Sequence, residues 1–188
     1  MTSDPNRYPL LAQPHIRLVG PITDQTYATW RTQLTACPPD GPIVVTLTTL
    51  GGDPEIARTM ADEVRLLCDY HGREMLFLGK VAVYSAGATF MSAFPVERRF
   101  LTRRTRLMLH ERQISKKITL DGPLRMVVSS IKAALHEIEH SVMIEEEGFR
   151  DLVAGSRVSF EQLRERAPSN WYIEAEEARD LGLVLDVI

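Results

Sequence analysis

Ser85 and His110 are the residues of this chain whose surroundings best suit nucleophilic chemistry. Ser85 opens a run of small residues, Ser85-Ala86-Gly87-Ala88, and His110 ends an apolar stretch, Leu107-Met108-Leu109-His110. A serine nucleophile needs a base that takes its proton and backbone N–H groups that stabilise the oxyanion. A diglycine, Gly51-Gly52, directly follows a β-rich segment and can offer one such donor. Together these features predict a serine hydrolase.

Ser85 is expected where a strand gives way to a helix. At such a junction a nucleophile is exposed at the sheet edge, and the first N–H groups of the helix point toward the reacting atom. Val83 occupies the first glycine position of the G-x-S-x-G elbow, so the chain does not carry the α/β-hydrolase motif. The plainer interpretation is that Ser85 only caps a helix and that the diglycine only forms a turn.

Length and composition indicate one globular domain. The chain has 188 residues, of which 25% are charged and 44% hydrophobic, and a formal net charge of -3. This charge gives no general reason to expect nucleic acid as a partner. Two cysteines, Cys37 and Cys68, do not make a disulfide framework and favour a reducing compartment. No segment resembles a signal peptide or a membrane span, so we expect a cytoplasmic protein without membrane contact.

Short β-rich runs alternate with longer helical ones, and this alternation predicts an α/β fold. The expected strands cover residues 16–19, 42–48, 75–78 continuing into 81–84, about 100–101, 107–109 and 183–187. The expected helices begin near residues 24, 53 and 85, follow Pro123 over about 123–153, and cover 159–166 and 175–181.

The site motifs resemble those of the Clp protease proteolytic subunit family. In that family a strand ends in Asn-Ser-Pro-Gly-Gly, the nucleophile lies in Ala-Ser-Met-Gly, and the base ends Met-Ile-His. Here Thr48-Thr49-Leu50-Gly51-Gly52, Tyr84-Ser85-Ala86-Gly87 and Met108-Leu109-His110 stand in those places. The Ser-to-His separation also fits, and Glu177 to Val184 is similar to the family's Glu-Ala-x-x-Tyr-Gly-Leu-Val. The resemblance extends from about Ile16 to the end of the chain.

By this resemblance, Ser85 is the nucleophile, His110 is the general base, and Gly51 or Gly52 with Ala86 forms the oxyanion hole. The implied fold is α/β, a Clp peptidase/crotonase-like β/α core with a long projecting handle helix. Residues 1–15 are expected to be an N-terminal leader and 16–188 the peptidase domain. The implied function is a serine endopeptidase that cleaves peptides or unfolded proteins through an acyl-enzyme and needs no cofactor or metal.

The resemblance also implies assembly. We expect a homo-oligomeric ring, stacked in pairs through the handle, with an ATP-dependent AAA+ unfoldase as the partner that feeds it. An alternative is a weak or inactive ring subunit that completes an assembly with a paralogous subunit. An acyl-CoA enzyme remains a further alternative, because crotonases share the fold.

The third member of the triad departs from the family. Aligned back from Gly182, the family's catalytic aspartate falls on Asn170. An asparagine can accept the imidazole Nδ1 proton but supplies no full charge. Three outcomes follow: the enzyme is slow, a carboxylate such as Glu174 or Glu176 substitutes, or the chain only builds rings. Two smaller departures are Leu50, in place of a proline, and Glu111-Arg112, in place of Gln-Pro.

Two other motifs compete for a function. His136-Glu137-Ile138-Glu139-His140 matches the H-E-x-x-H pattern of zinc peptidases. Its histidines lie opposite the apolar stripe of the predicted helix, so a solvated or subunit-facing surface is the favoured interpretation. A run of arginines, which could contact nucleic acid, is expected instead to form salt bridges between subunits; it comprises Arg98, Arg99, Arg103, Arg104, Arg106 and Arg112.

Overall fold

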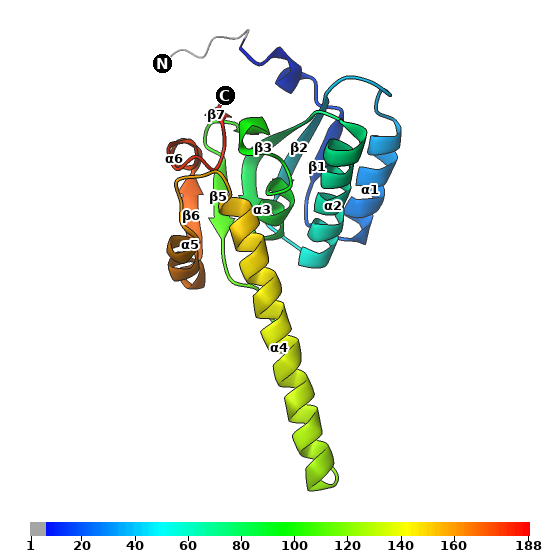
Figure 1. Cartoon of the computed structure of the whole chain (residues 1–188). Helices are drawn as coiled ribbons and strands as arrows, with labels where there is room; N and C mark the ends of the chain where they lie inside the picture. Colours follow the sequence, from blue (N-terminus) through cyan, green and yellow to red (C-terminus); the bar gives the residue numbers. More distant parts are fainter. Residues whose placement is uncertain (1–6) are drawn as a thin grey trace.

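The computed structural model describes residues 7–188, and within them seven strands form one sheet (Figure 1). The path of the sheet is β1-β2-β3-β4-β7, and β5 pairs with β3 and β6. All pairings are parallel except β5 with β6, which is antiparallel. The strands are β1 Ile16–Val19, β2 Ile43–Thr49, β3 Met75–Tyr84, β4 Arg99–Leu101, β5 Arg106–Leu109, β6 Trp171–Glu174 and β7 Asp186–Val187.

The helices that follow the strands begin at caps readable in the sequence. Thr23 caps α1 by accepting from the Thr26 N–H, and Asp53 caps α2 by accepting from the N–H groups of Glu55 and Ile56. The α-helices are α1 Asp24–Thr35, α2 Pro54–His71, α3 Ala86–Met91, α4 Leu124–Val153, α5 Phe160–Arg166 and α6 Ala175–Asp180. Short 3₁₀ turns cover Pro9–Ala12, Val96–Arg98 and Ala167–Ser169.

The main core lies between the sheet and the helices α1, α2 and α3. Trp30, Phe77, Phe90 and Phe94 are fully buried there, and their rings meet mostly edge to face. Glu63 on α2 ties α1 to this layer, because it accepts from the Trp30 indole N–H and the Tyr27 hydroxyl. The core therefore fixes α2 and α3 against the strands that lead to Ser85 and the diglycine.

A smaller apolar cluster covers part of the opposite face of the sheet. Leu11, from the first 3₁₀ turn, is buried there with Val44, Leu78 and Phe100. Part of the expected leader, residues 7–15, thus packs on the sheet, while residues 1–6 of the leader lie outside the described residues.

Strand β3 is irregular in the middle. Its first half pairs with β4 and its second half with β5. Leu47 pairs with Gly79 and Thr49 with Val83, so β3 uses two more residues than β2 over this stretch. Val81 lies in this bulge with φ +64°, an unusual backbone for a β-branched residue, and its N–H donates to the buried Thr105 hydroxyl. The change of partner brings the end of β3, and hence Ser85, beside β5.

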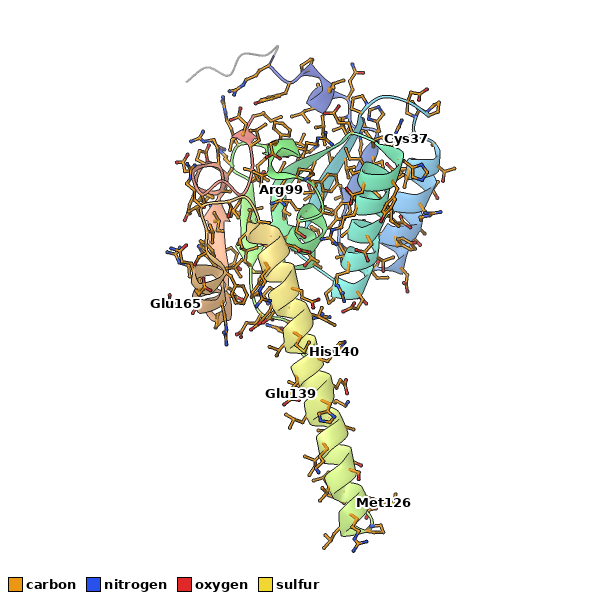
Figure 2. The ribbon with its side chains drawn as sticks, viewed as in Figure 1. Cys37, Arg99, Met126, Glu139, His140 and Glu165 are labelled. Carbon is orange, nitrogen blue, oxygen red and sulfur yellow. The ribbon has the colours of Figure 1, made fainter. Side chains whose placement is uncertain are left out.

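Arg99 is the buried cation of the fold. Its guanidinium donates to the backbone carbonyls of Ser92, Phe94, Leu152 and Leu183, so the ends of α3 and α4 meet at one side chain. Burial lowers the pKa of Arg99 to about 10, because removal from water disfavours the charged form. Figure 2 shows Arg99 inside the body of the molecule, whereas Met126 lies near the far end of α4.

Helix α4 projects from the body as the sequence predicts (Figure 1). Its 30 residues correspond to about 45 Å at 1.5 Å per residue. Its apolar residues Ile131, Leu135, Ile138 and Val142 are exposed. Such an exposed apolar stripe on a helix is typical of a surface that packs against a partner.

The predicted elements match the structure, with two differences at the C-terminal end. Strand β6 was not predicted, although its Trp-Tyr-Ile run is rich in strand-forming residues. The last strand is limited to Asp186–Val187, because Leu183 and Val184 are buried in the core before the chain reaches the sheet edge. Within residues 7–188, no helix is both long and apolar enough to cross a membrane.

Candidate active site

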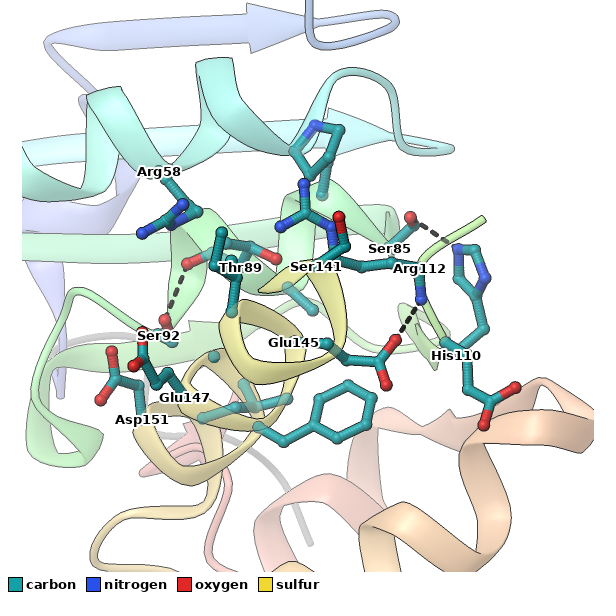
Figure 3. Close-up of a pocket in the computed structure, with 18 of the residues that line it drawn as sticks. Arg58, Ser85, Thr89, Ser92, His110, Arg112, Ser141, Glu145, Glu147 and Asp151 are labelled. Carbon is teal, nitrogen blue, oxygen red and sulfur yellow. Dashed lines mark hydrogen bonds between the residues drawn. The ribbon is translucent and has the colours of Figure 1, made fainter. Parts of the chain in front are cut away.

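Ser85 and His110 lie together at the ends of neighbouring strands (Figure 3). The His110 Nε2 atom is 2.7 Å from the Ser85 Oγ atom, a hydrogen-bond distance. Ser85 directly follows β3, and His110 directly follows β5, which pairs with the second half of β3. The Ser85 N–H also donates to the Met108 carbonyl, which ties the serine backbone to the strand that carries the histidine.

Ser85 has a strained backbone. Its φ is +54° and its ψ is -117°, a region that residues with a side chain rarely adopt. Such a conformation costs on the order of 1–3 kcal/mol and persists only where the surroundings enforce it. Here Met108 holds the Ser85 N–H, and the Ser85 carbonyl accepts from Ala88 and Thr89 in α3. The sharp turn places the hydroxyl against the imidazole.

The diglycine lies against the serine. A Cβ atom on Gly51 would be 3.0 Å from the Ser85 Cβ, and a Cβ on Gly52 would collide with the Ile22 backbone. Both glycines have positive φ, so the turn needs glycine for space as well as for conformation.

Thr49 distinguishes the two glycine N–H groups. Its buried hydroxyl accepts from the Gly51 N–H and donates to the Gly51 carbonyl, each at 3.0 Å. Among the described residues, the N–H groups of Gly52 and Ala86 make no hydrogen bond. The sequence left open whether Gly51 or Gly52 offers the oxyanion donor. The structure leaves the N–H of Gly52 available for this, because the N–H of Gly51 is already bonded to Thr49.

A cavity of about 640 Å³ opens beside Ser85 and His110. Its walls come from α2, α3, α4 and the segment after His110, and they carry both apolar and charged side chains. On α4, Glu145, Glu147 and Asp151 face this space together with Thr89 of α3 and Ser92 directly after α3 (Figure 3). Asp151 is paired with Arg65 of α2. The cavity has the size of a site for a side chain or a short peptide segment.

Asn170 lies across the β5–β6 pair from His110. Leu109 pairs with Trp171 in antiparallel register, so the next position after β5 faces the one before β6. Asn170 has φ +55°, is exposed, and within residues 7–188 makes no hydrogen bond to the His110 ring. The register thus brings Asn170 to the histidine end of the site, although no hydrogen bond joins it to the imidazole within the described residues.

The other carboxylates suggested from the sequence lie elsewhere. Glu174 is in register with Arg106 and pairs with its guanidinium at 2.7 Å. Arg106 is four residues from His110 along β5, or about 13 Å at strand spacing. Glu176 lies in the first turn of α6 and is exposed.

The two competing motifs are surface and structural features. His136 and His140 are exposed on α4, and Glu137 between them forms an ion pair with Lys116. No group of three metal-ligating side chains lies together in the described part of the chain. Four of the arginines have partners within this chain: Arg98 with Glu74, Arg99 with carbonyls, Arg106 with Glu174 and Arg112 with Glu55. Salt bridges of this cluster to other subunits stay a prediction.

The fold and the serine–histidine pair define an α/β protein of the Clp peptidase/crotonase-like class. The model of the Clp protease family matches residues 4–188, so the chain belongs to that family. Membership supports a Clp-type serine protease function in general terms, and rings are typical of the family.

Two relatives show how similar this chain is to known members of the family in sequence and in structure. The chain is 26% identical to the ATP-dependent Clp protease proteolytic subunit 3 of Rhizobium johnstonii, over 92% of this chain and 82% of that protein. Its structure superposes on an asparagine-to-aspartate mutant of ClpP1 from Listeria monocytogenes with a TM-score of 0.71. That match covers 96% of this chain and 94% of the other, at 21% identity.

Proposed function

We propose that the chain is a serine endopeptidase in which Ser85 is the nucleophile and His110 the general base. The observation that carries this proposal is the 2.7 Å approach of His110 Nε2 to Ser85 Oγ at the mouth of the cavity. Family membership supports the same class of reaction.

In the proposed first step, His110 Nε2 takes the Ser85 proton as Oγ attacks the scissile carbonyl carbon. The N–H groups of Gly52 and Ala86, which are unpaired among the described residues, donate to the oxyanion of the tetrahedral intermediate. His110 then gives its proton to the leaving amine, the C–N bond breaks, and an acyl-enzyme remains.

In the second step, water replaces the amine. His110 takes a proton from the water, whose oxygen attacks the acyl carbon, and the Ser85 Oγ leaves with the proton returned by His110. In both steps His110 takes and returns the proton, and the proposed reaction uses no cofactor. Asn170 is proposed to orient the imidazole weakly, since it lies in register with His110 and carries no charge.

The proposed assembly is a homo-oligomeric ring, paired with a second ring through the exposed stripe of α4. The bare Leu135 and its stripe neighbours support this, because they need an apolar partner. The relative from Rhizobium is described as ATP-dependent, which supports an ATP-dependent unfoldase as a partner that delivers unfolded protein.

A second candidate is a weak or silent ring subunit that works beside an active paralogue. It is favoured by one observation: Asn170 is exposed and makes no hydrogen bond to His110 within the described residues. An imidazole without its orienting partner loses the preferred tautomer, at a cost of about 10⁴ in rate in the trypsin-like case.

Covalent labelling separates the two candidates. A fluorophosphonate probe reacts only with an activated serine, and intact-mass measurement counts the adducts. One adduct on the native protein, absent in Ser85→Ala and slowed in His110→Ala, is the result expected for the peptidase. A native protein that forms rings and takes no adduct would contradict the peptidase and support the silent subunit.

A further inference from the structure

Arg112, the second residue after His110, connects three separate parts of the site. Its backbone N–H donates to the Glu145 carboxylate on α4 (Figure 3). Its guanidinium forms an ion pair with Glu55 in the first turn of α2. Arg112 and Glu145 both line the cavity beside Ser85. One residue therefore joins the segment leaving His110, the long helix, and the helix that follows the diglycine.

The segment that carries Arg112 has little else to hold it. Residues 111–122 contain no helix or strand, and they make no backbone–backbone hydrogen bond within the described chain. Side chains attach the segment instead, through Arg112 and through the ion pair of Lys116 with Glu137. The first of these attachments lies two residues from the imidazole.

The residue types at this point depart from the family pattern. The sequence has Glu111-Arg112 where the family pattern has Gln-Pro. A proline has no N–H group and no charge, so it could form neither the contact with Glu145 nor the one with Glu55. The substitution of arginine thus supplies two interactions that the common pattern lacks.

Glu55 links Arg112 to the start of α2, next to the turn that carries the proposed Gly52 oxyanion donor. Its N–H donates to the Asp53 carboxylate at 2.8 Å, and this bond holds the start of α2. Glu55 lies only three residues after Gly52 in the sequence. Its own carboxylate is shared by Arg112 and Arg58. Burial opposes the charge of Glu55, but both arginines outweigh it, and the pKa of Glu55 lies below its usual value. The Glu55 carboxylate at the start of α2 therefore stays ionised at neutral pH.

We propose that Arg112 is a positioning residue. By bridging Glu55 and Glu145 it holds the segment after His110 against α2 and α4, and so keeps the imidazole and the Gly52 N–H in place on either side of Ser85. The inference rests on the proposed roles of Ser85 and His110, and it adds a residue that acts through them.

The test combines serine reactivity with local hydrogen exchange. Arg112→Gln keeps the backbone N–H and removes the cation, Arg112→Lys keeps both, and Glu55→Gln removes the pair from the other side. Arg31→Gln is the matched control, because Arg31 forms an Arg–Glu pair with Glu63 between α1 and α2, outside the cavity. The readouts are the rate of fluorophosphonate labelling at Ser85 and the deuterium uptake of peptides covering 51–58 and 111–116.

We expect Arg112→Gln and Glu55→Gln each to slow labelling about tenfold, since small displacements of reacting groups are costly. Their effects should not add in the double variant, because both remove one interaction. Both should raise exchange in the two peptides, while Arg112→Lys restores most of the rate and Arg31→Gln matches the native protein. Thermal unfolding of each variant confirms that the fold is retained.

The outcomes separate this inference from the proposed peptidase. Labelling of Arg112→Gln at the native rate would overturn the positioning role, even if exchange rises. If the native protein itself takes no label, the peptidase function fails and hydrogen exchange decides the inference alone. Faster exchange in both peptides of Arg112→Gln then supports the bridge, and unchanged exchange overturns it.

Discussion

Thr49 is the buried residue on which the proposed oxyanion site depends most directly. Its hydroxyl satisfies both the N–H and the carbonyl of Gly51, and its methyl group fills the space beside Gly87. Thr49 thus touches the turn that carries the Gly52 donor and the helix that begins with Ala86. A residue with these contacts sets the distance between the two proposed donors.

Replacing Thr49 with valine tests this arrangement. Thr49→Val keeps the shape but leaves the Gly51 N–H unsatisfied, which costs about 1–3 kcal/mol of stability. We expect kcat to fall about tenfold with little change in KM, because the donors act mainly in the transition state. Thr49→Ser keeps the hydroxyl and should retain most of kcat. Equal peptidase kinetics in the native and valine proteins would contradict the assignment.

A substitution at Asn170 is expected to raise kcat, in contrast to Thr49→Val. Asn170→Asp restores a full charge at the position in register with His110, and an aspartate stabilises the imidazolium as it forms. We expect kcat on a peptide substrate to rise at least about tenfold. The control is Asn170→Ala, which should lie at or below the native rate. Identical rates for all three proteins would show that the position does not act on His110.

Among the elements, strands and helices with strong local signals were predicted correctly. The β-branched run of β2, the caps of α1 and α2, and the periodic stripe of α4 each determine their element through nearby residues. Strand β6 was missed because four residues give little periodicity, and it forms through its pairing with β5.

The candidate site was predictable in part, because some of its residues also stand in strong local sequence patterns. Ser85, His110 and the diglycine stand in recognisable local motifs, and the structure places them together. The sequence could not choose between the N–H groups of Gly51 and Gly52, because that choice depends on the Thr49 hydroxyl. The contacts of Arg112 join residues up to 57 positions apart, so no local pattern announces them.

Glu145 on α4 should give the protein a measurable pH dependence. Burial raises the pKa of its carboxyl, and the charges of Glu111 and Glu146 raise it further, against the lowering by Arg112. A carboxyl with a raised pKa in the folded state binds more protons than in the unfolded state, so its contribution to stability falls as pH rises through that range. The free energy of unfolding of the native protein should therefore decline with pH relative to Glu145→Gln, upward from the ordinary glutamate pKa of 4.5.

Denaturant unfolding at several pH values measures this difference. Glu147→Gln is the matched control, since Glu147 is an exposed glutamate of the same helix. Parallel pH profiles for the native protein and Glu145→Gln would contradict the expectation. Because Arg112 donates to this same carboxylate, the profile also reports on the bridge between the long helix and the site.

For the whole molecule, the exposed stripe of α4 predicts how rings pair. Leu135 is 50% exposed in the single chain. Leu135→Lys places a charge in the proposed contact, and we expect the paired assembly to fall apart into single rings, as measured by analytical ultracentrifugation. Ser129→Lys, on the face away from the stripe, is the control and should leave the assembly unchanged. Loss of pairing in both variants, or in neither, would contradict a contact through this stripe.

The bulge in β3 determines which changes in chain length the site can tolerate. It contributes two residues beyond those of β2, an even number, so side chains after it keep their faces. Deleting one residue between Gly79 and Val83 would turn Ser85 to the other side of the sheet. Deleting two would remove the bulge, and with it the contact of the Val81 N–H with Thr105 and the change of partner from β4 to β5 that brings Ser85 beside His110. Insertions and deletions should therefore be accepted in the surface turn at 36–42 and rejected at 80–82, although Lys80 and Val81 in that segment are exposed.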